Sequence, residues 1–148
     1  MSVYDDVCKA AEVVIKAIAP HRPRVGVILG SGLGSFADTL EDPKTVDYGK
    51  IPGFAQSKVK GHAGQLVSGR CGKTNVLAMQ GRVHLYEGYP ISQVVLPART
   101  LVKAGCEVLV ITNAAGGINA ALEPGDLVLI NDHINFTCQN PLVGDNDD

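Results

Sequence analysis

The sequence is short of closely spaced cysteines, of basic charge and of long apolar runs. Its cysteines, Cys8, Cys71, Cys106 and Cys138, form no C-x-x-C pair, which argues against a zinc site, a redox motif and a disulfide framework. A formal net charge of -2 gives no basic surface for nucleic acid. No stretch approaches the ~20 apolar residues that span a bilayer, and the N-terminus lacks the pattern of a secretory signal. We therefore expect a cytoplasmic protein with neither nucleic acid nor a membrane as a partner.

What is present suits one folded domain. The chain has 148 residues, of which 45% are hydrophobic and 19% are charged. That length can bury a core, and the balance argues against disorder.

Local patterns predict alternating helices and strands. Helical spacing covers Val3–Ile18 and Ile91–Gly105, with a short helical stretch around Phe36–Leu40 and an irregularity at Pro97. Strands are predicted over Arg24–Leu29, over the two arms of a hairpin within residues 65–81, and over Glu107–Asn113 and Gly125–Ile134. These elements predict an α/β fold in which helices flank a mixed β-sheet. The final "NPLVGDNDD" follows the last predicted strand without a closing helix, as in an acidic tail or an interrupted domain.

The segment "GRVHLYEGYP" alternates polar and apolar side chains. In an extended chain, Arg82, His84 and Tyr86 would share one face, with Val83 and Leu85 on the other. A guanidinium and an imidazole can both donate to phosphate oxygens, and a phenol suits a sugar or base edge. The alternative is an edge strand with a merely solvated face.

The segment "LGSGLGSFAD" follows a predicted strand and precedes a helical stretch. Backbone N–H groups in such a loop can cradle an anion, and Ser31 adds a hydroxyl. Ser35 stands where the dinucleotide fingerprint requires glycine, and no Walker lysine follows. A tight turn without a ligand is the alternative.

Two further loops are candidates for ligand contacts. "KGHAGQ" carries His62, and "TNAAGG" follows a strand, with small residues that would let the Ala114 amide reach a ligand oxygen. An ordinary turn and a packing requirement are the respective alternatives. Outside these loops, we expect His21 to be exposed and Glu87 to pair with a neighbouring donor rather than to act as a catalytic acid.

Taken together, the candidate donors are numerous and no acidic cluster accompanies them. Ser31, His62, Arg82, His84 and the Ala114 amide would suit an oxyanion bound without a metal, most simply inorganic phosphate.

Several motifs occur here in the order found in a known family. "GSGLGSFAD", "GHAGQLVSG", "MQGRVHLYEGYP", "TNAAGGIN", "GDLVLINDHINF" and "QNPLVGDND" resemble those of the trimeric, low-molecular-mass purine nucleoside phosphorylases. The resemblance runs from about Val25 to the last residue. It implies that residues 1–148 are the N-terminal part of a single nucleoside phosphorylase domain, incomplete at its C-terminus.

The resemblance also implies roles for individual residues. Ser31, Arg82, His84 and the Ala114 amide would bind phosphate, His62 would lie on a mobile loop near it, and Tyr86 would contact the ribose. The implied reaction is reversible phosphorolysis of a purine (deoxy)ribonucleoside to the free base and (deoxy)ribose 1-phosphate, by a homotrimer without a metal or organic cofactor. The purine-binding acid is expected beyond Asp148, so the catalytic residue on the base side is not assigned in this chain.

Two other functions fit parts of the sequence. One is a non-catalytic phosphate- or nucleoside-binding remnant that lacks the purine-binding half. The other is a Rossmann-like dinucleotide binder, which Ser35 and the missing acidic ribose ligand disfavour.

Overall fold

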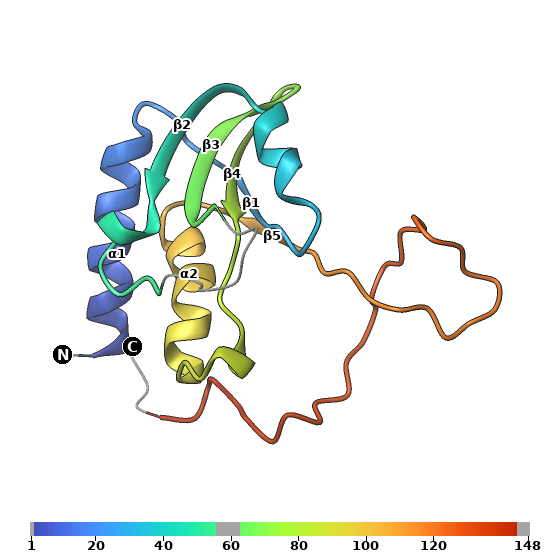
Figure 1. Cartoon of the computed structure of the whole chain (residues 1–148). Coiled ribbons are helices and arrows are strands. Elements are labelled where there is room, and N and C mark those ends of the chain that lie inside the picture. Colours follow the sequence, from blue (N-terminus) through green and yellow to red (C-terminus); the bar gives the residue numbers. More distant parts are fainter. Residues whose placement is uncertain (1, 56–62, 145–148) are drawn as a thin grey trace.

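The computed structural model of the chain describes residues 2–55 and 63–144. The N-terminal residues with apolar side chains at helical spacing form helix α1, Val3–Ile18. Ser2 begins the helix with a capping box: its hydroxyl accepts from the Asp5 N–H, and the Asp5 carboxylate accepts from the Ser2 N–H. Helix α2, Ile91–Lys103, continues through the buried Pro97 rather than ending there. Both helices lie on the same face of the sheet and pack against each other (Figure 1).

The sheet is mixed, as the sequence predicts. Its strands are β1 (Val25–Ile28), β2 (Glu41–Asp47), β3 (Gln65–Cys71), β4 (Thr74–Gln80) and β5 (Val108–Ile111), in the order β2-β3-β4-β1-β5. Strand β1 runs parallel to β4 and β5, whereas β2, β3 and β4 pair antiparallel. Short 3-10 helices, η1 (Gly34–Thr39), η2 (Tyr48–Lys50) and η3 (Leu85–Glu87), lie in the connections.

Alternating side chains along the strands build a separate core on each face of the sheet. Ile28, Leu66 and Leu77 face the helices and pack with Val14 and Leu101 from α1 and α2. The intervening positions, such as Val27 and Val67, form the second core with Ala37 and Leu40 from η1 and the residue that follows it. The sheet is therefore a fixed platform for the loops that leave its strand ends.

The predicted strand Gly125–Ile134 is wrong. These residues have no regular secondary structure, and Leu127 and Leu129 are 99% and 93% exposed. A β-strand needs a neighbouring strand to pair its backbone groups, and this segment lies on the long excursion that leaves the sheet after β5 (Figure 1). The apolar pattern indicates that these side chains could be buried, but it does not show that a neighbouring strand is present to pair with the segment.

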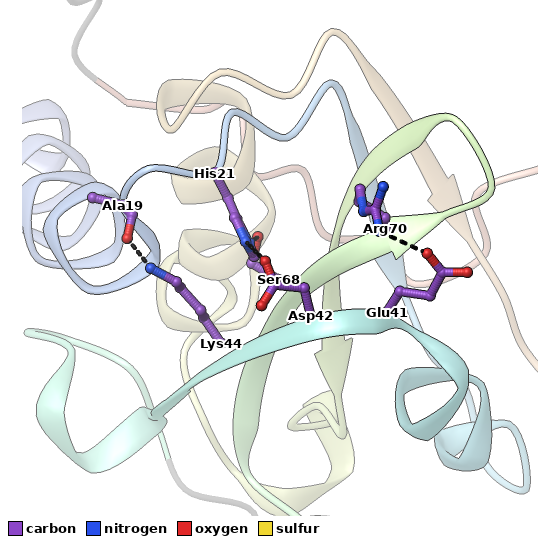
Figure 2. Close-up of polar contacts among 7 residues, drawn as sticks. All are labelled: Ala19, His21, Glu41, Asp42, Lys44, Ser68 and Arg70. Atoms are coloured by element: carbon purple, nitrogen blue, oxygen red, sulfur yellow. Dashed lines mark hydrogen bonds and ion pairs between the residues drawn. The ribbon is translucent and has the colours of Figure 1, made fainter.

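Strand β2 is an edge strand fixed by polar contacts at its outer end. The prediction that His21 is exposed is wrong, because its side chain is only 9% exposed. Its ring lies between Ser68 of β3 (Nδ1 to Oγ, 3.1 Å) and Asp42 of β2 (Nε2 to Oδ2, 3.3 Å), as Figure 2 shows. Lys44 donates to the Ala19 carbonyl in the same region.

The arrangement of Ser68, His21 and Asp42 resembles the catalytic triad of a hydrolase. Ser68 is fully buried, however, so its hydroxyl cannot reach a substrate.

We expect Ser68→Ala to lower the free energy of unfolding by about 1–3 kcal/mol, because a ring nitrogen of His21 would lose its partner away from water. Chemical denaturation would measure the change. Ser92→Ala, at an exposed position of α2, is the control and should stay within about 0.5 kcal/mol of the original protein. Equal effects of the two substitutions would show that the His21–Ser68 contact does not stabilise the fold.

The Cys106 thiol is buried, and burial raises its pKa to about 11. This folded-state pKa lies above that of an unfolded thiol. The contribution of the Cys106 thiol to the stability of the fold is therefore fully present below the unfolded pKa and is lost as the pH rises through about 11. At about pH 8, where an ordinary thiol is partly ionised, iodoacetamide should modify the exposed Cys71 and Cys138 and spare Cys106. Peptide mass spectrometry would detect this, and equal alkylation of Cys106 and Cys71 would contradict it.

Candidate active site

The three parallel strands end together, which brings three of the candidate loops to one edge of the sheet. Ile28 of β1 is opposite Met79 of β4 and Ile111 of β5. The loops that begin at Gly30, Gly81 and Thr112 therefore leave the sheet at the same level. In open α/β sheets, ligands bind at the carboxyl ends of parallel strands.

The segment of residues 30–35, here called the glycine loop, includes the first two residues of η1 and lines a cavity of about 290 Å³. The other lining residues come from the end of β4 and from the residues before β3, so that the full set is Gly30, Ser31, Gly32, Gly34, Ser35, Ala63, Gln80 and Gly81. Ser31 is exposed to this space, so its hydroxyl is accessible to a small ligand. His62, the other candidate from this region, lies outside the described residues.

Arg82 is half-buried and is held toward the end of β5. Its Nη1 donates to the Thr112 carbonyl over 2.7 Å. A guanidinium has five N–H donors, and this bond engages one of them while it fixes the plane of the group. The contact joins the loop after β4 to the loop after β5, in which Ala114 is exposed two residues beyond Thr112.

The expected extended conformation of residues 82–86 holds only in part. Val83 is buried and Arg82 and His84 are half-buried, but the chain then turns into η3, so that Leu85 is 38% and Tyr86 77% exposed. The turn is closed by Glu87, whose carboxylate accepts from the His84 N–H over 2.8 Å, which confirms the expected pairing of Glu87.

Tyr86 nevertheless lies beside His84. Their rings stack with centroids 4.8 Å apart and planes 8° from parallel. The imidazole and the phenol are thus neighbours because of the turn and not because of strand alternation. Stacking favours one relative orientation of the two rings. Neither residue lines the cavity beside the glycine loop.

Two side chains that the sequence did not single out hold the loops in place. Gln80 donates through Nε2 to the Gly34 carbonyl (3.0 Å) and to Asp38 Oδ1 (3.1 Å), which ties β4 to the glycine loop and η1. The buried Tyr48 donates its hydroxyl to the Gly81 carbonyl over 2.6 Å, directly before Arg82. Burial raises the pKa of Tyr48 well above its ordinary value, so the phenol remains a neutral donor.

The loops that leave this edge carry hydroxyl, guanidinium, imidazole and backbone amide donors, a set that suits an anion with several oxygens. Of these, Ser31 lines the cavity and the Arg82 guanidinium lies at Thr112. Within residues 2–55 and 63–144, no group of three or more His, Cys, Asp and Glu side chains is arranged to hold a metal ion. No helix in the same residues has the length and apolar character needed to cross a membrane.

The chain is similar to known proteins in both sequence and structure. Residues 24–148 match the phosphorylase superfamily. The chain is 49% identical over 142 residues to purine nucleoside phosphorylase 1 of Bacillus subtilis, a match that covers 96% of this chain and 52% of that protein. It is also 49% identical over 148 residues to the purine nucleoside phosphorylase of Rattus norvegicus, covering 98% of this chain and 51% of the relative.

Solved structures of purine nucleoside phosphorylases are also similar to the chain. Isoform 2 of purine nucleoside phosphorylase from Schistosoma mansoni, in complex with cytosine and ribose-1-phosphate, superposes with a TM-score of 0.86 and 44% sequence identity. The superposition covers 97% of this chain and 51% of that one. The mixed sheet flanked by helices is therefore a nucleoside phosphorylase-like fold, and the chain spans about half the length of the curated relatives it matches.

Proposed function

The chain belongs to the phosphorylase superfamily, and on that premise we propose that the protein catalyses the reversible phosphorolysis of purine nucleosides and deoxynucleosides. Inorganic phosphate is the co-substrate, and no cofactor is part of the proposal. The observation that carries it is the convergence of the glycine loop, the Arg82 segment and the loop after β5 at one sheet edge. The identity of about half of all aligned positions to purine nucleoside phosphorylases supports it.

In this proposal residues of this chain bind the phosphate. Ser31, Arg82, His84 and the amide of Ala114 donate to its oxygens, and His62 is a further donor. The 2.7 Å bond from Arg82 to Thr112 supports a guanidinium that is oriented before phosphate arrives. Tyr86 contacts the ribose, a role supported by its stacking on His84, which keeps the sugar contact next to the phosphate.

Catalysis then consists chiefly of positioning and electrostatics. A phosphate oxygen forms the new bond to the anomeric carbon of the ribose, while the bond from that carbon to the purine nitrogen breaks and its electron pair leaves with the base. Positive charge develops on the sugar in the transition state, and the bound phosphate dianion stabilises it. The departing base must gain a proton or a hydrogen bond, and we place the group that provides it beyond Asp148.

The test is the rate of inosine loss by the full-length gene product with and without phosphate. Loss that depends on phosphate and saturates with it supports the proposal. Equal cleavage without phosphate would instead indicate a hydrolase, and the phosphate site would have no catalytic role.

A phosphate-binding protein without turnover is the second candidate, because the donors that this proposal assigns in the chain all face the phosphate or the ribose and none of them the base. It would bind phosphate saturably without releasing a purine base.

The proposal also includes the oligomeric state of the protein and its location in the cell. A homotrimer is supported by the resemblance of the motifs, and light scattering of the purified protein would measure it. A cytoplasmic location is supported by four free thiols, which suit a reducing compartment.

A further inference from the structure

Hydrogen bonds of Thr112 join three segments of the candidate site. Its hydroxyl donates to the Ile28 carbonyl over 3.0 Å and accepts from the Gly30 N–H over 2.9 Å. Its own carbonyl accepts from Arg82 Nη1. One residue at the end of β5 therefore contacts the end of β1, the start of the glycine loop and the arginine.

The hydroxyl is the specific part of this arrangement. Any residue at position 112 offers a carbonyl to Arg82, but donation to Ile28 together with acceptance from Gly30 requires a hydroxyl. The Ile28 carbonyl also accepts from the Thr112 N–H over 3.0 Å, so it keeps a bond when the hydroxyl is removed. The buried Gly30 N–H instead loses the hydroxyl that it donates to.

The two loops approach closely at this point. A Cβ atom on Gly30 would lie 2.7 Å from the Thr112 carbonyl oxygen, so the backbones are in direct contact. With the hydroxyl gone, the Gly30 amide must shift to find another partner or remain unpaired at a cost comparable to a lost hydrogen bond. The next residue is Ser31, so this shift moves a proposed phosphate ligand.

We infer that Thr112 is a positioning residue that fixes the glycine loop for phosphate. This inference rests on the proposed function, because it concerns the same site. Thr112 acts through Gly30 and Ser31 and does not itself contact substrate. A merely structural role would lower stability and affect the phosphate and nucleoside parameters alike.

The experiment uses the full-length gene product and compares Thr112→Val, which keeps the shape and removes the hydroxyl, with Thr112→Ser, which keeps the hydroxyl. For Thr112→Val we expect the KM for phosphate to rise about tenfold, the equivalent of one lost hydrogen bond, with the KM for inosine within about twofold. Thr112→Ser should stay within about threefold of the original protein in both. Calorimetric titration with inorganic phosphate should show the same order of affinities without turnover.

An unchanged KM for phosphate in Thr112→Val would overturn the inference, as would a Thr112→Ser variant as impaired as Thr112→Val. If Thr112→Val does not fold, Thr112→Cys replaces it, because a thiol is a weak donor and acceptor, and the same rise in phosphate KM is expected. Failure of the proposed function is distinguishable, because the unsubstituted protein itself would then show no phosphate-dependent loss of inosine.

Discussion

Arg82→Ala should lower the phosphate-dependent kcat/KM of the full-length gene product by about 10³-fold, the upper range for loss of one preorganised charged donor. The guanidinium is half-buried and already oriented by its bond to Thr112, so alanine removes both its charge and its geometry. Initial rates of inosine phosphorolysis over a range of phosphate concentrations would measure the loss. Lysine at this position should recover little, because it lacks the planar fork that pairs with two phosphate oxygens.

The control is Arg70→Ala, which also removes an arginine. Arg70 is exposed on β3 and pairs with Glu41 at the surface. Its loss should leave the rate within about twofold of the original and should change stability by no more than about 1 kcal/mol. An Arg82→Ala variant that is folded and as active as Arg70→Ala would contradict the assignment of Arg82 to the phosphate.

Gly30→Ala should destabilise the fold by about 1–3 kcal/mol, which corresponds to a fall in Tm of roughly 5 °C. A Cβ at this position would lie 2.7 Å from the Thr112 carbonyl oxygen and 2.8 Å from Asn113 Cα. Both atoms belong to the backbone, so no side chain can rotate away, and the loops after β1 and β5 must separate. Thermal unfolding followed by circular dichroism would measure the change.

Gly34→Ala is the matched control for stability, since it lies in the same loop and adds the same methyl group. The nearest atom to its Cβ would be Gln80 Cγ at 3.7 Å, an ordinary van der Waals contact. Its Tm should therefore stay within about 2 °C of the original. Equal falls in Tm for the two variants would mean that the close approach of Gly30 to Thr112 is not the cause of the lower stability of Gly30→Ala.

The sequence predicts the fold correctly where the apolar periodicity and the residues that begin or end an element indicate the same bounds. Helix α1 is confirmed over its whole length, and strand β1 and the β3–β4 hairpin also lie where the apolar runs end at glycine or a turn. Strand β2 was missed because "EDPKTVD" carries a proline and four charged residues and buries only Val46. An edge strand can tolerate this composition, and the register shifts between Glu41 and Lys44, around Pro43.

The candidate site was predictable at the level of its loops and not of its contacts. A glycine loop after a strand is visible in the sequence, and so is a small-residue loop after β5. The bond between Gly30 and Thr112 joins residues 82 positions apart, and it depends on β1 and β5 being neighbours in the sheet. No local pattern carries that information, which is why Thr112 and Gln80 emerged only from the three-dimensional structure.

The most direct test of a phosphate-using reaction is to identify its products by ³¹P nuclear magnetic resonance. The full-length gene product is incubated with inosine and inorganic phosphate, and the purine base is quantified in the same sample. The expected result is a new sugar 1-phosphate resonance that grows in equal amount with free hypoxanthine while the inorganic phosphate resonance falls. Hypoxanthine released with the phosphate signal unchanged would contradict phosphorolysis.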